Sequence, residues 1–223
     1  MGRLYIIPTP IGNLGDISLR ALEILKDVDL ILAEDTRKSG ILLKHYDINT
    51  PLISHHKFNE HRESGKICGQ LASGKNIALI TDSGTPGISD PGFLLVRTCI
   101  EKGIELETLP GATAVIPALV NSGLPCDRFC FEGFLPQKKG RKKRISRLEN
   151  EDRTMVFYES PHRIVKLIDQ LIDVFGEERK ASLSRELTKI HEENIRGSLG
   201  YLAEKLENTQ ARGEYVLVVA GKQ

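Results

Sequence analysis

Short apolar runs alternate with amphipathic stretches along the whole chain. In the first half, the runs that have the length and composition of strands are residues 4–7, 28–33, 77–80 and 104–109. Two stretches between them, 18–26 and 94–101, carry apolar residues at helical spacing, and Gly103 ends the second. This alternation predicts an α/β protein whose sheet is covered by crossover helices.

The same cycle restarts in the second half of the chain. The strands expected there are residues 129–132, 154–158, 181–184 and 215–220, and the expected helix is 164–175. The segment 112–125 is a short helix-like run that ends in the breaker cluster Ser-Gly-Leu-Pro, so we expect it to join two halves. The sequence therefore predicts two α/β domains, 1–119 and 120–223.

Composition limits the class of protein. A chain of 223 residues with 40% hydrophobic residues can bury a core. Because it contains no run of about 20 apolar residues, we expect a cytoplasmic protein without a membrane partner. Its four cysteines, at 68, 99, 126 and 130, lack the spacing of a zinc site, so buried thiols and no metal are expected.

Positive charge is concentrated in one place, although the formal net charge is only +1. Residues 138–144 hold six cations in seven positions: Lys138, Lys139, Arg141, Lys142, Lys143 and Arg144. Such a run suits RNA phosphates, and the alternative is a solvated surface loop. With seven Phe, five Tyr and no Trp, recognition by shape and phosphate contact is favoured over base stacking.

Active sites of α/β proteins gather in the loops that follow strands. The loop 8–16 holds two glycines but matches neither the dinucleotide fingerprint nor a phosphate-binding Walker loop, and a plain turn explains it equally well. In the loop 34–37, Glu-Asp-Thr-Arg, helix capping explains Asp35 or Thr36. Capping does not explain Arg37, because the start of a helix disfavours a cation.

The loop 81–92 is the densest candidate. Its prolines stiffen the backbone and its glycines expose N–H and C=O groups between Asp82 and Asp90, which predicts a rigid cradle for a ligand. Farther along, the small residues of 109–114 open a helix and could admit a flat ligand against the backbone.

Taken together, several motifs resemble the tetrapyrrole-methylase superfamily. Within it, they are similar to the branch that 2′-O-methylates a cytidine of bacterial 16S ribosomal RNA. The resemblance runs from residue 4 to residue 220 and keeps the order of the motifs, which are TPIGNL (9–14), EDTR (34–37), DSGTPGISDPG (82–92), PGA (110–112), GFLP (133–136), YESPHR (158–163) and RELTK (185–189).

The resemblance implies two α/β domains of the class III methyltransferase type, a homodimer, and S-adenosylmethionine in the cleft between the domains. It also implies the residues that line the cofactor pocket: Pro10, Asp82, Gly84, Thr85, Pro86, Gly87, Ile88, Ala112, Thr113, Ala114, Phe134, Leu135, Tyr158, Glu159, Gly213 and Glu214. The chain departs from the family pattern at Ser83, usually Ala, and at Phe58, often His.

Methyl transfer to oxygen is an in-line displacement that gains chiefly from alignment and from exclusion of water, and it needs no metal. Because a ribose hydroxyl is a weak nucleophile, a base or an electrostatic partner would help. We expect Asp35 or Glu60 as proton acceptor and Arg37 or Lys189 as electrostatic partner, with Glu186 also a candidate.

The expected partner is 16S ribosomal RNA or the assembled small subunit. Two other readings stay open at this point: methylation of a tetrapyrrole precursor, as in cobalamin or sirohaem synthesis, and a non-catalytic ribosome-assembly factor.

Overall fold

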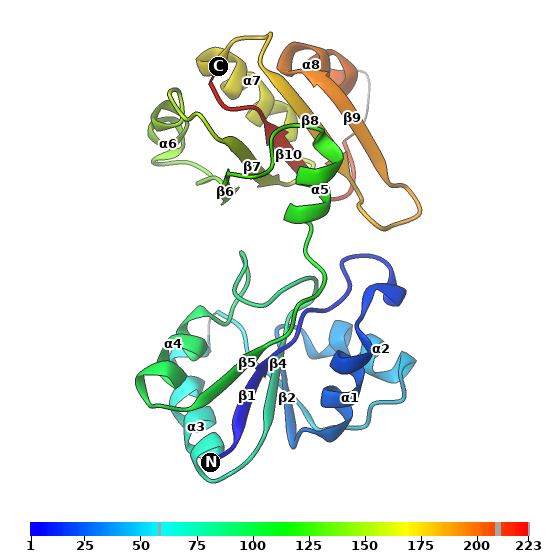
Figure 1. Ribbon diagram of the computed structural model, residues 1–223, viewed down its shortest axis with the longest axis vertical. Coiled ribbons are helices and arrows are strands. Elements are labelled where there is room, and N and C mark those ends of the chain that lie inside the picture. The colour runs from blue at the N-terminus through cyan, green and yellow to red at the C-terminus, as the bar shows by residue number, and fades with distance from the viewer. Residues whose placement is uncertain (58, 208–210, 223) are drawn as a thin grey trace. The chain divides into compact units, whose positions relative to one another are not determined.

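The computed structural model describes residues 1–57, 59–207 and 211–222, so Phe58 lies outside the described residues. The chain divides into two compact units, Met1–Thr113 and Ala114–Gln223 (Figure 1). The boundary that the sequence analysis expects after residue 119 falls inside α5 (Val115–Ser122). This helix packs against strands of the second unit, so it is an element of that unit and more than a connection.

The first unit is built on five parallel strands in the order β3-β2-β4-β1-β5. Its elements are β1 (Arg3–Ile6), α1 (Leu19–Asp27), β2 (Leu30–Ala33), α2 (Thr36–His45), β3 (Leu52–Ser54), α3 (Glu60–Ala72), β4 (Ile77–Ile80), α4 (Phe93–Glu101) and β5 (Glu105–Thr108), with a short 3-10 turn at Leu14–Asp16. The expected strands and helices of this half are confirmed to within two residues at each end. The helix start expected at Asp35 or Thr36 is that of α2, whereas β3 and α3 were not expected.

Helices cover both faces of this sheet (Figure 1). Apolar residues of α3 and α4 pack with Leu4 and Leu79 on one face, whereas those of α1 and α2 pack with Ile31 and Ile80 on the other. The neighbouring strands β1 and β4 are therefore followed by helices on opposite faces. Such a switch point between adjacent parallel strands is where α/β sheets bind ligands, at the carboxyl ends of the strands.

The second unit carries a mixed five-stranded sheet in the order β6-β7-β10-β8-β9. Its elements after α5 are β6 (Phe129–Phe134), α6 (Arg141–Arg147), β7 (Thr154–Glu159), α7 (Ile164–Phe175), β8 (Lys180–Arg185), β9 (Glu193–Ser198), α8 (Leu199–Glu207) and β10 (Tyr215–Val219). β6 and β7 are parallel, and β10 runs antiparallel to β7 and to β8. The elements α6, β9 and α8 were not expected.

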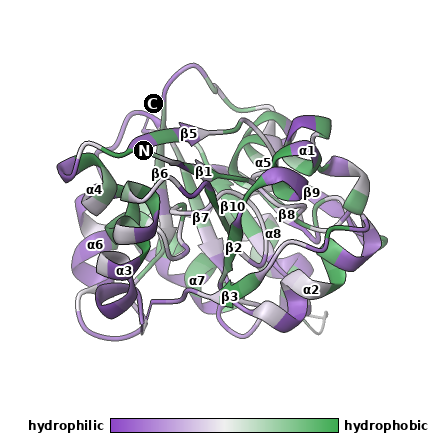
Figure 2. Ribbon diagram, turned by 90° about the horizontal axis from the view of Figure 1, so that it is seen from below, coloured by the Kyte–Doolittle hydropathy of each residue, from purple (hydrophilic) through white to green (hydrophobic). Residues whose placement is uncertain are grey.

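The core of this unit lies between its sheet and the helices α6, α7 and α8. Leu167, Ile168 and Leu171 form the buried stripe of α7, which ends at Gly176 with positive φ. Figure 2 shows that α6 is hydrophilic along most of its length, whereas β10 is apolar. Within the described ranges, no helix is long and apolar enough to cross a membrane.

Candidate active site

Three loops at the carboxyl edge of the first sheet are bonded to one another. Thr9, after β1, exchanges two backbone hydrogen bonds of 2.9 Å with Gly84, after β4. The buried Thr9 hydroxyl also donates to the carbonyl of Thr81 at 3.0 Å. Thr85 Oγ1 donates to the carbonyl of Ala112, after β5, at 3.0 Å. The loops after β1, β4 and β5 therefore form one cradle at the switch point, which we call the glycine cradle (8–13, 81–92 and 109–113).

Glycine is required at two positions of the glycine cradle. Gly84 has φ +83°, a backbone conformation that L side chains rarely adopt. At Gly111 the constraint is space, because a Cβ would lie 2.7 Å from the Cβ of Pro8. Among the expected cofactor residues, Pro10, 82–88, Ala112 and Thr113 belong to this cradle, whereas Ala114 begins the second unit as the N-cap of α5.

Acidic and basic side chains border the cradle after β2. Asp82 Oδ1 accepts from the backbone N–H of Asp35 at 3.1 Å, and its Oδ2 accepts from Lys38 Nζ at 2.8 Å. Burial, and then the charge of Asp82, raise the pKa of Glu34. Lys38 was not expected in the site. Its only signal was its position five residues after β2 ends at Ala33, beside the more conspicuous Arg37.

Asp35 and Arg37, both expected to act in catalysis, are bonded to each other. The Asp35 carboxylate caps α2 by accepting from the Arg37 backbone N–H, and it also binds the guanidinium at 2.8 Å and 3.1 Å. Hydrogen bonds from the side chain and then from the backbone of Arg37 hold the pKa of Asp35 well below its usual range. A carboxylate held ionised in this way is a poor proton acceptor, whereas Arg37 keeps an 89% exposed side chain.

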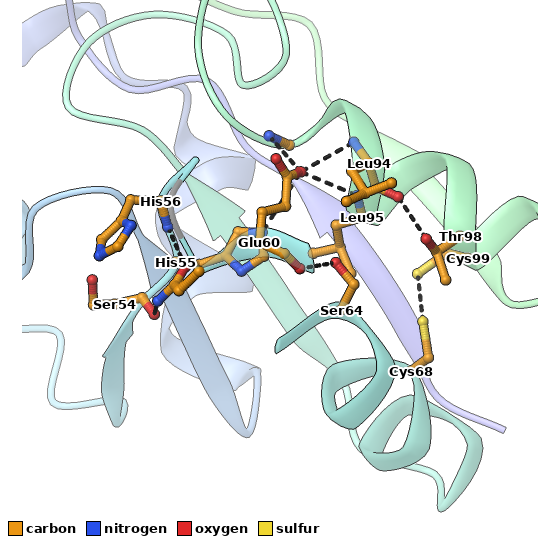
Figure 3. Close-up of polar contacts among 12 residues, drawn as sticks. Ser54, His55, His56, Glu60, Ser64, Cys68, Leu94, Leu95, Thr98 and Cys99 are labelled. Carbon is orange, nitrogen blue, oxygen red and sulfur yellow. Dashed lines mark hydrogen bonds and ion pairs between the residues drawn. The ribbon is translucent and has the colours of Figure 1, made fainter. Parts of the chain in front are cut away.

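Glu60 does not have the surroundings of a proton acceptor. It is 8% exposed, and its Oε1 accepts from three backbone N–H groups at the start of α4. His55 Nε2 lies 3.9 Å from the same oxygen (Figure 3). His55 was not expected in the site, because it follows β3, a strand that was itself not expected.

In the second unit, Lys189 joins two acidic residues at the edge where β8 ends and β10 begins. Its Nζ donates to Glu186 Oε1 and to Glu214 Oε2, both at 2.9 Å, and the backbone N–H of Glu214 donates to Glu186 Oε1. Burial lowers the pKa of Lys189, but the hydrogen bonds to Glu186 and Glu214 outweigh it and raise the pKa overall. The ammonium group therefore stays charged. A Cβ at Gly213 would meet the Glu186 carboxyl at 2.6 Å, which explains the glycine beside this cluster.

The expected aromatic and acidic cofactor residues of this unit divide into exposed and buried ones. Phe134, at the end of β6, is 54% exposed and packs edge-on against Tyr158 at 5.6 Å between ring centroids. Leu135 is buried in the core, so only its backbone can face a ligand. Glu159 is also buried, and its carboxylate is bonded to Arg141 and Arg163, so its side chain is not available to a cofactor.

The basic run is only partly a surface feature. Lys138, Lys139, Lys142 and Lys143 are exposed, as the expected RNA contact requires. Arg144 is exposed too but binds Glu132 at 2.6 Å. Arg141 does not belong with them: it is 4% exposed and donates two hydrogen bonds to Glu159 and one to Gln170. Its guanidinium neutralises a buried carboxylate, and this corrects the expectation that it contacts RNA.

In the part of the chain that the structure describes, no group of three or more His, Cys, Asp or Glu side chains could hold a metal ion. Cys68 and Cys99 are buried with their sulfurs 3.7 Å apart, and burial raises the pKa of Cys99 to about 12.

The two-unit α/β fold agrees with comparisons to known proteins. The chain belongs to the family of tetrapyrrole (corrin/porphyrin) methylases, whose sequence profile matches residues 3–203. This membership confirms the sequence expectation of an S-adenosylmethionine-dependent methyltransferase.

Relatives matched over nearly the whole chain share one name. The ribosomal RNA small subunit methyltransferase I of Haemophilus influenzae is 52% identical and is matched over 99% of this chain and 79% of its own length. The protein of the same name from Thermotoga maritima is 42% identical over the whole of both chains. A uroporphyrin-III C-methyltransferase from Thermus thermophilus, solved with S-adenyl homocysteine, shares the fold with a TM-score of 0.68 at 16% identity, over 98% of this chain and 97% of its own.

Proposed function

We propose that the protein transfers a methyl group from S-adenosylmethionine to the ribose 2′-hydroxyl of a cytidine in 16S ribosomal RNA. The observation that carries the RNA substrate is the identity of about half of all residues, over nearly the whole chain, with proteins named ribosomal RNA small subunit methyltransferase I. The exposed lysines around α6 support it, since phosphates respond to local rather than net charge.

The glycine cradle fits the cofactor. Backbone N–H and C=O groups exposed by glycines can bind its polar atoms. The carboxylate of Asp82 also binds Lys38, but its side chain is 22% exposed and suits a ligand that bears a positive sulfonium. In the first unit, the residues that we propose for cofactor binding are Pro10, Asp82, Gly84, Thr85, Pro86, Gly87, Ile88, Ala112 and Thr113. In the second unit they are Ala114, Phe134, the backbone of Leu135 and of Glu159, Tyr158, Gly213 and Glu214.

When bound, S-adenosylmethionine supplies a methyl group on a sulfonium that an oxygen nucleophile can displace. The contribution of the chain is alignment, and the bonds that tie Thr9 to Gly84 and Thr85 to Ala112 hold three loops in fixed register for that purpose. Lys189 stays charged between Glu186 and Glu214, so we propose it as the electrostatic partner of the developing alkoxide, with Arg37 as a second cation.

We infer that Asp35 orients Arg37 rather than accepting the proton, because its pKa is depressed by that arginine. We also infer that the protein acts in the cytoplasm as a homodimer, and that its substrate is 16S ribosomal RNA or the assembled small subunit. The homodimer rests on family resemblance alone.

The test is methyl transfer to matched substrates. The protein is incubated with S-adenosylmethionine labelled in its methyl group and either small ribosomal subunits from cells that lack this gene or uroporphyrinogen. Label is expected in 16S ribosomal RNA. Label in the tetrapyrrole would favour a precursor methylase, and absence of transfer with no calorimetric binding of S-adenosylmethionine would favour a non-catalytic assembly factor.

A further inference from the structure

The glycine cradle ends where α4 begins, and that end lacks a cap of its own. Gly92 occupies the N-cap position with φ +129°, and glycine has no side chain to satisfy the free N–H groups of the first turn. This φ strains any L side chain, and a Cβ would also lie 2.9 Å from Leu79 Cδ2, so a capping side chain is disfavoured at this position. The N–H groups need an acceptor from elsewhere in the fold.

Glu60, the first residue of α3, supplies that acceptor. Its Oε1 accepts from the backbone N–H groups of Gly92 at 3.1 Å, Leu94 at 3.0 Å and Leu95 at 3.2 Å. Figure 3 shows the carboxylate turned toward the start of α4. A negative charge at a helix N-terminus is favoured by the helix dipole, and at 8% exposure water screens it little.

The position of Glu60 is fixed from its other side. Its own backbone N–H donates to the carbonyl of His56 at 3.0 Å, and its carbonyl accepts from the Ser64 hydroxyl at 2.6 Å. The backbone N–H of His55 donates to the carbonyl of Ala33, the last residue of β2, at 2.7 Å. An unbroken series of contacts therefore runs from the end of β2, through the start of α3, to the end of the loop 81–92.

We propose that Glu60 is a positioning residue that holds the loop 81–92 in the conformation that binds S-adenosylmethionine. The inference rests on the proposed placing of the cofactor against residues 82–88. This role differs from that of proton acceptor, because Glu60 Oε1, the oxygen nearest His55, already accepts three hydrogen bonds from the backbone. His55, 1% exposed, packs beside that oxygen and shields it from water.

Two substitutions separate positioning from proton transfer. Glu60→Gln keeps an oxygen acceptor at the same place, so cofactor affinity and the rate of methyl transfer at saturating cofactor should stay within about threefold of the unsubstituted protein. Glu60→Ala removes the acceptor and leaves the loop in its binding conformation for only a fraction of the time. Its dissociation constant for S-adenosylmethionine should rise by at least about tenfold, with a smaller change in the saturated rate.

The matched control is Glu63→Ala. Glu63 lies in the same first turn of α3, but its carboxylate binds Arg62 and Lys66, and among the described residues it makes no hydrogen bond to the loop 81–92. The dissociation constant of Glu63→Ala for S-adenosylmethionine should equal that of the unsubstituted protein. Affinities are measured by calorimetry on the full chain, and thermal unfolding of each variant checks that it is folded.

If Glu60→Ala does not fold, Glu60→Asp takes its place, since its shorter side chain cannot reach all three N–H groups. Faster amide hydrogen exchange at Gly92, Leu94 and Leu95, together with weaker cofactor binding, is expected. Unchanged affinity in the Ala or Asp variant would overturn the proposal. So would a loss of about a hundredfold in the saturated rate of Glu60→Gln at unchanged affinity, which is the signature of a proton acceptor. Because affinity is measured without RNA, a failure to methylate ribosomal RNA would refute the proposed function and leave this inference standing.

Discussion

Replacement of Glu159 should unfold the second unit at much lower denaturant concentration than the intact protein needs. Its carboxylate is fully buried and accepts from Arg141 at 3.0 Å and 3.1 Å, from Arg163 at 2.8 Å and from the backbone N–H of Ser160 at 2.9 Å. Glu159→Ala would leave the 5% exposed guanidinium of Arg141 without a counter-charge. Breaking a buried pair by removing one partner costs about 3–5 kcal/mol.

The double variant Glu159→Leu with Arg141→Met tests whether the unpaired buried charge causes this loss of stability. Replacing a buried ion pair by apolar residues of similar volume is often neutral or stabilising, so the double variant should recover most of the stability that the single one loses. Arg163, with 26% of its side chain exposed, can turn to solvent.

Urea unfolding followed by circular dichroism measures both variants, with the transition of the second unit fitted separately. A loss below about 1 kcal/mol for Glu159→Ala, or a double variant less stable than the single one, would refute the reasoning that desolvated charge dominates here.

Three other predictions follow from single contacts. Lys142→Gln and Lys143→Gln should each reduce the salt dependence of RNA binding by about 0.7–0.9 in the slope of log affinity against log salt, as measured by filter binding, whereas Lys166→Gln on α7 should not. Thr85→Val, which loses the bond to Ala112, should weaken S-adenosylmethionine binding about fivefold by calorimetry, whereas Thr50→Val, which loses a bond to Leu25, should not. Asp35 has a lowered pKa, so its contribution to stability is present above the unfolded pKa of about 3.9 and is lost as the pH falls. The difference in urea midpoint between Asp35→Asn and the unsubstituted protein should therefore shrink between about pH 5 and pH 2.

The central strands were predictable because burial on both faces leaves an uninterrupted apolar run. Ile77–Ile80 is such a run, and it was found at its correct ends. The edge strands β3 and β9 lack such a run. Their exposed positions, among them Ile53 and Ser54, dilute the apolar pattern, so these strands were missed. Helix α3 was missed because its buried apolar residues, Ile67, Cys68 and Leu71, lie only in its second half.

Of the candidate site, the sequence could predict the loops but not the partners of their side chains. Glycine and proline density identified residues 81–92, because backbone conformation depends on local residue types. The cap that Glu60 provides joins residues 32 to 35 positions apart, and the pair Arg141–Glu159 spans 18. The six cations of 138–144 look alike in sequence, and only packing distinguishes the buried Arg141 from its exposed neighbours.

The most direct test of the proposed function is to digest 16S ribosomal RNA, methylated by the protein in small subunits, and to identify the labelled nucleoside by mass spectrometry. We predict that the label appears in 2′-O-methylcytidine. The phosphodiester on the 3′ side of that nucleotide should resist alkaline cleavage, because its 2′-hydroxyl is blocked. Label on a base, or in a nucleoside other than cytidine, would contradict the account.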